Sequence, residues 1–518
     1  MDNRNSHKYI TWLCALVITM TSMAGCSASS NSSSSKSESK NESATTTAAA
    51  ATTQPIVTLA PETTQIINET PASYEAFGID KTAKEEFKNK IKENTKIPVI
   101  SITTKDDEDI VSREKYTSCV VDVFNTDEHD IDEASAGIKV RGNSSAFYGD
   151  VAQILSNQVP YRIKFDTKTN MLGLNNGAQC KSWVLLKSDW DLIRNDIAFR
   201  FGRTIMGEDN FCSDAQLVHV YVNEEFKGIY LLCEQCQINP ERVDITEPEN
   251  GYTGWDIGYY LELDNYATSE ETNHYIEMDY GEATVTDIEG ETRQFVPAEY
   301  SIKNDLYSQN QIDFISKYLN NIFTIVYEAC ENGKFYSFDE NYDLVEAEYT
   351  TAEETVNAVM DVQSVVDMYM LYEIVHDYDC GEGSFFMCVD FSPESKCPKL
   401  KFTSPWDFNW AYNDSTEQYH AAAFTDQSFV NQNGDRSNPW FIILMKQDWF
   451  VNQVKEKWTV LKESDAIKSC IEEEKAYIEE YKDDLNKTDE WATESATKLF
   501  DWIENRIYWL NSEWVIKQ

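Results

Sequence analysis

The pattern of apolar residues changes once along this chain, near residue 308. Before that point, short segments alternate polar and apolar side chains or are rich in β-branched residues, as strands are. Such segments lie at 97–102, 116–124, 138–141, 161–165, 182–186, 217–222, 228–233 and 259–264. Helical spacing then dominates 309–333, 362–378 and most of 440–518, with a strand pair at 384–391 and 399–403. Strands followed by helices predict an α+β fold with two lobes, a β-rich N-terminal half and an α-rich C-terminal half.

The N-terminus has the features of a targeting signal. Arg4 and Lys8 precede an apolar run at 9–20 that is too short for an ordinary membrane-spanning helix, and small residues then lead to Met23-Ala-Gly-Cys26. This order is typical of a bacterial lipoprotein signal peptide over 1–25, with Cys26 left to carry a lipid anchor. The alternative is a plain secretory signal with an incidental cysteine. We expect a cell membrane lipoprotein on the extracytoplasmic face.

A polar linker follows the signal. Ser, Thr, Ala and Asn dominate 26–73, which therefore has too little apolar surface to order itself. We predict a disordered tether there, a short N-terminal helix over 74–96, and a folded domain over 97–518. The domain divides into a β-rich part at 97–300 and an α-rich part at 301–518.

The chain is strongly acidic, with 44 Lys and Arg against 89 Asp and Glu and a formal net charge of −45. A basic stripe that matches a phosphate backbone cannot form on such a surface, so nucleic acid is excluded as a partner. The acidity provides solubility, or else it favours a basic polypeptide or bound cations.

The chain has twelve cysteines, and they show no zinc-finger spacing. Cys233 and Cys236 form one C-x-x-C, without a second pair at the required distance. We expect mostly buried free thiols, with one or two disulfides left open.

Four cations lie on two segments that we expect to pair as neighbouring strands. Apolar residues alternate with them, so they share one strand face: Lys139, Arg141, Arg162 and Lys164. The first segment ends in Gly142-Asn143-Ser144-Ser145, a type of turn whose backbone N–H groups hold phosphate oxygens. The sequence therefore predicts a phosphate site, with a solvated strand face and an ordinary hairpin turn as the alternative.

Asp407 stands among large apolar residues in Pro405-Trp-Asp-Phe-Asn409, after a β-prone run. Desolvating a carboxylate is costly unless it is paired or bound to a metal, so we interpret Asp407 as a metal ligand. About 28 residues earlier, Glu373, Asp377 and Asp379 end the helix predicted at 362–378 and oppose its dipole. An acid on a loop, a strand pair and a second acid are typical of the base and metal ligand of phosphotransferases.

Two other interpretations stay open at this point. Asp191 and Arg194, at the start of a helix predicted over 189–207, suit a helix cap and a surface ion pair. Asp379 and Asp407 also suit the carboxylate pair of a carbohydrate-active enzyme. The cationic side chains of Arg141 and Lys164 would have no role in such a carbohydrate-active enzyme.

Taken together, these stretches make the chain similar to the CotH kinase family, the spore-coat protein H-like atypical secreted protein kinases. The resemblance runs in order over roughly 97–515. Its motifs are Ile138-Lys-Val-Arg-Gly-Asn-Ser-Ser145, Pro160-Tyr-Arg-Ile-Lys-Phe-Asp166, Trp183-Val-Leu-Leu186, Asp191-Leu-Ile-Arg-Asn195, Val220-Tyr-Val-Asn223, Gly228-Ile-Tyr230, Tyr260-Leu-Glu-Leu-Asp264, 373–379 and Ser404-Pro-Trp-Asp-Phe408.

The resemblance implies a bilobal, protein-kinase-like fold that uses ATP and Mg²⁺ or Mn²⁺ to phosphorylate serine or threonine hydroxyls of surface or coat proteins. It implies that Asp379 orients the acceptor hydroxyl and that Asp407, with Asn409, holds the metal. Protein segments rich in Ser and Thr are the expected substrates, and the membrane is a partner through Cys26. The nucleotide residues that it implies, including a pair between Glu234 and Lys164, are Arg141, Asn143, Ser144, Lys164, Arg194 and Glu234.

The chain departs from the family pattern at several positions. The family often has an acid at the position of Asn409, an Asn at that of Asp377, lysines at those of Asn157 and Gln158, and a Gly at that of Ser404. A catalytically weak or inactive surface binding or adhesion module is therefore the alternative function.

Overall fold

The computed structural model describes residues 68, 70–188, 191–264, 267, 274–286, 288, 290, 292–295, 297–377, 379–412, 420, 422–423 and 438–515. The predicted signal peptide, the predicted lipidation site Cys26, most of the predicted tether and Asp189 lie outside the described residues. Among the described helices, none combines the length and apolar character that a membrane crossing requires.

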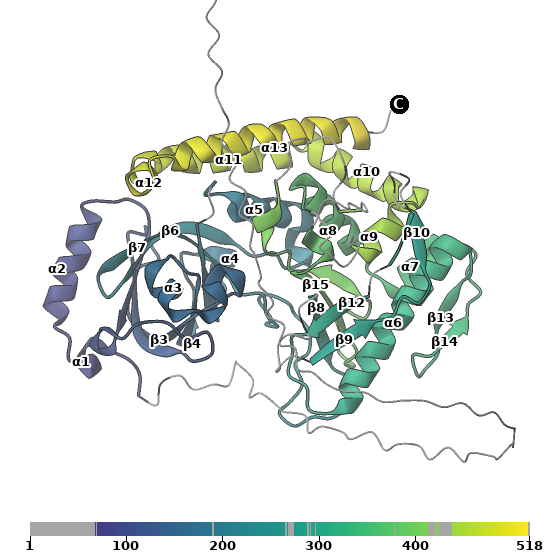
Figure 1. Ribbon diagram of the computed structural model, residues 1–518, viewed down its shortest axis with the longest axis horizontal. Helices are drawn as coiled ribbons and strands as arrows, with labels where there is room; N and C mark the ends of the chain where they lie inside the picture. Colours follow the sequence, from purple (N-terminus) through teal and green to yellow (C-terminus); the bar gives the residue numbers. More distant parts are fainter. Residues whose placement is uncertain are drawn as a thin grey trace, which may run out of the picture. The chain divides into compact units, whose positions relative to one another are not determined.

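Seven strands of the first half form a closed barrel (Figure 1). In spatial order they are β1 (Val99–Thr104), β2 (Thr117–Phe124), β3 (Ile131–Val140), β4 (Tyr161–Thr169), β5 (Cys180–Lys187), β7 (Glu225–Glu234) and β6 (Ala215–Val222). Neighbours run antiparallel, except that β1 and β6 close the barrel as a parallel pair. Closure pairs every strand on both sides and removes the exposed edges of an open sheet.

The alternation of side chains along each strand determines which residues fill the barrel interior. Along β4, the side chains of Tyr161, Ile163 and Phe165 belong to the apolar cluster of the barrel interior. Because successive side chains of a strand point to opposite faces, Arg162 and Lys164 lie on the outer face. The predicted pairing of the two cationic segments is confirmed, since Lys139 of β3 is opposite Arg162 and Gly137 is opposite Lys164.

The residues before β1 are fixed to the outside of the barrel. Helix α1 spans Tyr74–Phe77 and α2 spans Lys81–Lys92. The Lys88 ammonium lies 2.9 Å from the buried Asp122 carboxylate of β2, which also accepts from the Tyr74 hydroxyl. Asn68 donates to Asp166 and Ala72 N donates to Ser135 Oγ. The described end of the predicted tether therefore lies against the barrel.

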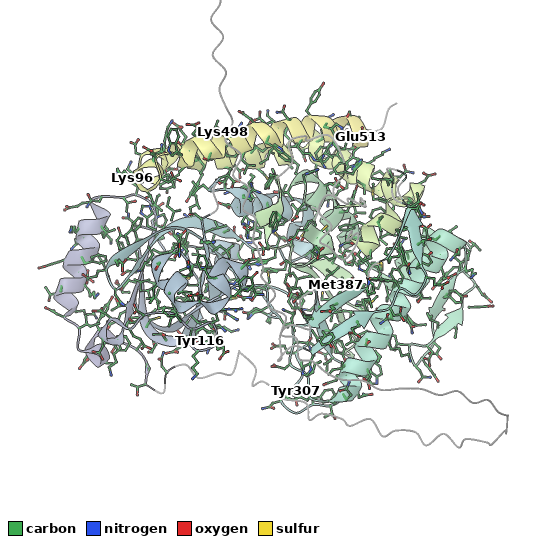
Figure 2. All side chains as sticks on the ribbon, in the orientation of Figure 1. Lys96, Tyr116, Tyr307, Met387, Lys498 and Glu513 are labelled. Carbon is green, nitrogen blue, oxygen red and sulfur yellow. The ribbon has the colours of Figure 1, made fainter. Side chains whose placement is uncertain are left out.

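A second sheet of five antiparallel strands joins the two halves of the chain. In spatial order its strands are β16 (Lys401–Thr403), β15 (Phe385–Asp390), β8 (Gly258–Leu263), β12 (Ala298–Ile302) and β9 (His274–Met278). The predicted pair β15–β16 is confirmed, and β15 also pairs with β8 along its whole length. Met387 at the centre of β15 is buried in the core beneath this sheet (Figure 2).

Helices make up most of the second half, and the mixture of helix and strand predicted from the sequence is confirmed. Helix α6 (Gln309–Asn332) begins with a capping box of Ser308 and Gln311 and is capped at its C-terminus by Gly333, whose φ of 62° suits glycine. Further helices are α7 (Ala352–Val359), α8 (Val362–Ile374), α9 (Pro439–Leu444), α10 (Asp448–Glu463), α11 (Ala466–Glu480), α12 (Lys482–Thr488) and α13 (Ala492–Trp514). Short elements are α3 (Val151–Ser156), α4 (Leu174–Gly177), β10 (Thr284–Thr286), β11 (Thr292–Gln294), β13 (Tyr336–Phe338) and β14 (Leu344–Glu346).

Helix α5 (Arg194–Met206) packs against α8 and α11 and connects the barrel to the helical half. It begins later than the predicted residue 189, because Leu192 has a φ of 70° that no α-helix contains. At Gly202, a Cβ atom would lie 2.5 Å from Cys212 Sγ and 3.2 Å from Leu371 of α8. Glycine is therefore required at this position for α5 to lie this close to α8.

The contact of α5 with α11 buries acids, which predicts a pH effect on stability. Burial, followed by the charge of Asp196, raises the pKa of Glu474 from its ordinary value to about 8. The folded protein then holds this proton more tightly than the unfolded chain, so stability falls as the pH rises from about 4.5 to about 8. We expect Glu474→Gln to raise the urea midpoint at pH 8 more than at pH 5. The exposed Glu473→Gln is the control, and an equal gain at both pH values contradicts the prediction.

Candidate functional site

The first acidic loop follows α8. The helix ends at Ile374 rather than at 378 as predicted, because His376 has a φ of 54° and Asp377 N donates to Tyr372 O at 2.9 Å. This turn directs Asp377 into the interior, where it is 1% exposed. Asp379 N then donates to Asp377 Oδ1 at 2.9 Å, and Asp379 begins a single 3₁₀ turn.

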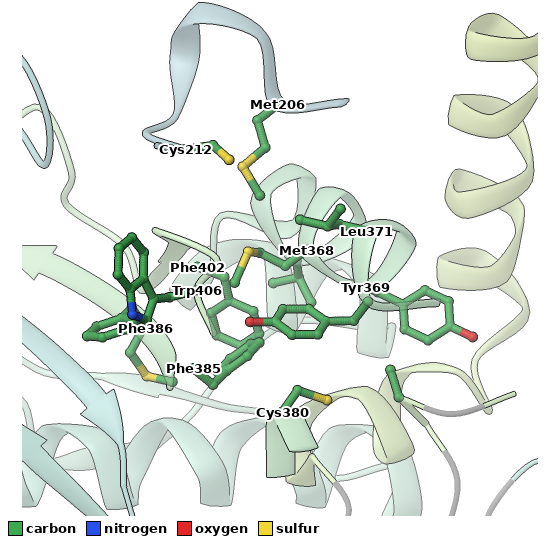
Figure 3. Packing of buried hydrophobic residues seen from close by; sticks show 14 of the residues in the cluster. Met206, Cys212, Met368, Tyr369, Leu371, Cys380, Phe385, Phe386, Phe402 and Trp406 are labelled. Carbon is green, nitrogen blue, oxygen red and sulfur yellow. The ribbon is translucent and has the colours of Figure 1, made fainter. Parts of the chain in front are cut away.

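The second acidic loop follows β16. Asp407 has a φ of 61°, a backbone conformation that is strained for residues other than glycine and is common at functional sites. On either side of it, the Trp406 and Phe408 rings contact Phe199 of α5, with centroids 5.4 and 5.9 Å away. Trp406 and Phe386 of β15 belong to the same buried apolar core, on which the loop rests (Figure 3). The loop is thus fixed by aromatic packing.

The two loops bring three carboxylates together. Burial, followed by the charge of Asp407, raises the pKa of Asp379 to about 7. Burial, followed by the charge of Asp379, raises the pKa of Asp377 well above its ordinary value. Burial also raises the pKa of Asp407, while the Arg141 guanidinium acts to lower it. The structure therefore places Asp379 and Asp407 at one site, where a cation would relieve their repulsion.

One cation from the end of the barrel strands, Arg141, acts on these acids. Lys164 is 2% exposed, and its Nζ lies 6.0 Å from the centroid of the Tyr116 ring, over which Lys139 Nζ also lies at 5.0 Å. The Arg141 guanidinium lies 5.5 Å from the Trp406 ring and lowers the pKa of Asp407. Lys164 is therefore not on a solvated strand face, and Arg141 links the cations to the second loop.

The turn after β3 lies at the end of this face. Gly142 has a φ of 90°, and a Cβ atom there would lie 2.2 Å from Ser145 Oγ, so the turn requires glycine. Asn143 and Ser144 are exposed, and the Asn143 carbonyl accepts from Ala146 N at 3.2 Å. Arg113 donates to Asn143 Oδ1. The predicted turn is confirmed, and its amide side chain is held in place.

Arg194 lies under the second loop instead of on the surface. Its guanidinium contacts the Asp191 carboxylate at 2.6 Å, and both side chains are at least 90% buried. The same guanidinium donates to the carbonyl oxygens of Asn409 and Ala411. The predicted ion pair between Asp191 and Arg194 is therefore confirmed, but its predicted position on the surface is wrong. Arg194 holds the 409–411 backbone in place, so it is a positioning residue for Asp407.

Glu234 does not pair with Lys164 as predicted. Strand register places Lys164 opposite Ser182 and Glu234 opposite Trp183, and these adjacent residues of β5 point to opposite faces. Glu234 instead contacts Arg242 at 3.1 Å, within a buried pair. The sequence did not reveal this ion pair, because Arg242 lies in an irregular loop after β7, where residue spacing does not predict contacts.

Glu373 has a structural role that the sequence did not reveal. Its carboxylate contacts Arg506 of α13 at 2.8 Å, and both side chains are fully buried. Arg506 Nε also donates to the Glu373 carbonyl oxygen at 2.9 Å, and Ala422 N donates to the carboxylate. Helix α13 thus fixes the end of α8, from which the first acidic loop begins.

Glu262 of β8 is a further residue that we did not predict. Lys303 contacts it at 2.6 Å, and burial raises its pKa while Lys303 and Arg141 act to lower it. Glu262 therefore shares the positive field of Arg141 with Asp407. An acid between Leu261 and Leu263 in an apolar strand was the signal that could have identified it.

Within the described residues, no group of three or more His, Cys, Asp and Glu side chains is arranged to hold a metal ion by itself. Carboxylate oxygens such as those of Asp407 suit Mg²⁺ or Mn²⁺, which are commonly held by one or two carboxylates, water and substrate phosphates.

The buried pair of Glu373 and Arg506 supports a stability prediction. Arg506→Met leaves the buried Glu373 charge without its guanidinium partner, with His420 still 3.5 Å away, so we expect a loss of about 3 kcal/mol in the free energy of unfolding. Adding Glu373→Gln should recover part of that loss. Lys498→Met, on the exposed face of α13 (Figure 2), is the control and should change little. Urea unfolding measures these proteins together with the Glu373→Gln single variant, and a double-variant loss equal to the sum of the two single losses contradicts the coupling.

A family model described as CotH kinase protein matches residues 138–510. A comparison with curated proteins gave no match. The matched region contains the end of β3 with Lys139, all of β4, both acidic loops, and Arg506 of α13. Since the match covers most of the length of the chain, the protein belongs to the CotH kinase family.

Proposed function

We propose that the protein is an ATP-dependent kinase that transfers the γ-phosphate to serine or threonine hydroxyls of other proteins. The observation that carries this proposal is the proximity of the Asp379 and Asp407 carboxylates, with the Arg141 guanidinium acting on Asp407. Phosphoryl transfer requires positioning and charge neutralisation rather than covalent catalysis. Membership of the CotH kinase family supports the same reaction class.

In this proposal the barrel binds the nucleotide. Lys164 and Arg141 neutralise its phosphates, and the exposed turn at Asn143 and Ser144 lies beside them. Arg194 acts by positioning the second loop and not by touching the nucleotide. The barrel and the helical half thereby take the places of the two lobes of a protein kinase.

Asp407 would hold Mg²⁺ or Mn²⁺ together with the phosphates of ATP. When bound, the metal ion neutralises charge on the transferring phosphoryl group. Asp379 orients the acceptor hydroxyl and accepts its proton. The backbone N–H of Asp379, bonded to Asp377, fixes the start of the turn that carries this carboxylate.

The proposed location and partners follow from the N-terminal sequence. A lipid at Cys26 would anchor the protein on the extracytoplasmic face of the membrane, and residues 26–67 would act as a tether. Surface or coat proteins with Ser- and Thr-rich segments are the proposed substrates.

The catalytic assignment predicts a loss of activity in two variants. We expect Asp379→Asn and Asp407→Asn each to lower phosphate transfer from ATP to a Ser-rich acceptor protein by roughly 10²–10⁴-fold. Asp501→Asn, on the exposed face of α13, is the matched control and should leave the rate unchanged. Activity that persists in both site variants would refute these roles.

A thermal-shift experiment separates the kinase from a non-catalytic binding module. ATP with Mn²⁺ should raise the melting temperature of the wild-type protein, because a ligand of the native state stabilises it. Lys164→Met should reduce the shift. If the wild-type protein shows no shift, the binding-module function is favoured.

The pKa of Asp379 predicts a pH dependence. Its carboxylate must be ionised to accept the hydroxyl proton, and its pKa of about 7 means that the ionised fraction grows as the pH rises through 7. We expect kcat/KM to increase about tenfold per pH unit below 7 and to level off above it. Glu382→Gln removes a neighbouring negative charge and should shift this rise to lower pH. A flat profile between pH 5.5 and 8 would contradict the assignment.

A further inference from the structure

Two cysteine sulfur atoms meet at the hairpin of β15 and β16. Cys388 lies in β15, and Cys397 lies in the connection that leads to β16. Their Sγ atoms are 3.7 Å apart, and the two residues are 3% and 8% exposed. The S–S distance of a formed disulfide is about 2.05 Å, so one short side-chain adjustment separates these sulfur atoms from a bond.

The backbone of the hairpin fixes this proximity. Asp390 N donates to Cys397 O at 2.7 Å, and Cys397 N donates to Ser395 Oγ at 3.1 Å. Cys388 is opposite Lys401 of β16 in the strand register. Cys397 Sγ also lies 3.7 Å from the carbonyl oxygen of Cys388. The two cysteines are therefore held together by main-chain pairing, and their approach does not depend on a mobile side chain.

The two thiols differ in how an oxidant would reach them. Cys397 stands between Lys396 and Pro398, which are both exposed. Cys388 lies inside β15, which pairs with β8 on one side and β16 on the other. The hydrogen bond with Cys397, followed by burial, raises the pKa of the Cys388 thiol well above its ordinary value. Cys397 is thus the thiol that reacts first, and Cys388 is the one that follows.

We propose that Cys388 and Cys397 are a disulfide site, oxidised by exchange with a small-molecule disulfide of the oxidised-glutathione type, RSSR. The Cys397 thiolate attacks one sulfur of RSSR, which forms a mixed disulfide and releases RS⁻. The released RS⁻ takes the proton of Cys388, and the Cys388 thiolate attacks Cys397 Sγ and expels the second RS⁻. Two thiols are oxidised to one disulfide, and RSSR is reduced to two RSH.

The cross-link would close residues 389–396 into a loop and fasten the start of the segment that leads to β16. The same segment continues through β16 to the loop of Asp407, so oxidation would fasten the hairpin on which that loop depends. Disulfides persist in oxidising compartments, and the predicted extracytoplasmic location is one of them. Formation of the disulfide does not depend on phosphate transfer.

Peptide mapping tests the site. The folded full-length protein is incubated with oxidised glutathione, its remaining thiols are alkylated in urea, and trypsin digests it without reduction. Cleavage after Lys396 separates peptide 335–396, which contains Cys388, from peptide 397–399, which contains Cys397. We expect mass spectrometry to find the two peptides linked in the wild-type protein and separate after reduction.

Peptide 335–396 also contains Cys380, so variants identify the partner. Cys388→Ala and Cys397→Ala should each abolish the linked peptides. Cys380→Ala, at an equally buried thiol, is the matched control and should keep them. Wild-type protein without the link, or a link that persists in Cys388→Ala, overturns the proposal.

Stability supplies a second readout. A phosphine reductant should lower the urea midpoint of the oxidised wild-type protein, because reduction restores the freedom of the unfolded chain. The midpoints of Cys388→Ala and Cys397→Ala should not respond to the reductant. Each variant is compared with itself, with and without reductant, so a cost of the substitution does not enter. An equal response in all three proteins would assign the effect to other cysteines and contradict the proposed pair.

Discussion

The repulsion among three desolvated carboxylates is the constraint on which the site depends. Asp377, Asp379 and Asp407 lie on two loops that the core supports from below, and each carries a raised pKa. Such a cluster persists only where the surrounding structure holds it. Two cations from other parts of the fold act against this repulsion: Arg141 on Asp407 and Arg194 on Asp377.

Three distant contacts hold this arrangement. The Phe199 ring of α5 packs between Trp406 and Phe408, Arg194 binds the carbonyl oxygens of the second loop, and Arg506 of α13 binds the end of α8. Each contact connects the acids to an element more than 100 residues away in the sequence. Helices that look peripheral therefore determine where the two acidic loops lie.

Much of the fold was readable from local pattern. Alternation in 161–165 and 138–141 predicted two paired strands, and the capping residues Ser308 and Gly333 marked both ends of α6. Helix ends near the site were predicted less well, because Leu192 and His376 adopt positive φ angles that propensity does not anticipate. The pairing of Glu234 with Arg242 depends on strand register and an irregular loop, which local pattern does not encode.

The sequence by itself determined the mixture of strands and helices, the alternation that puts Arg162 and Lys164 on one strand face, and the isolation of Asp407 among aromatic residues. Periodicity and desolvation cost are local properties, so residue order alone reveals them. Only the tertiary structure decided that Glu373 pairs with Arg506 of α13 and that Arg194 donates to the backbone of the loop after β16. It also decided that Asn195 turns the Asn409 amide toward Asp407. The reason is that hydrogen-bond direction and ion-pair choice depend on which distant groups folding brings within about 3 Å.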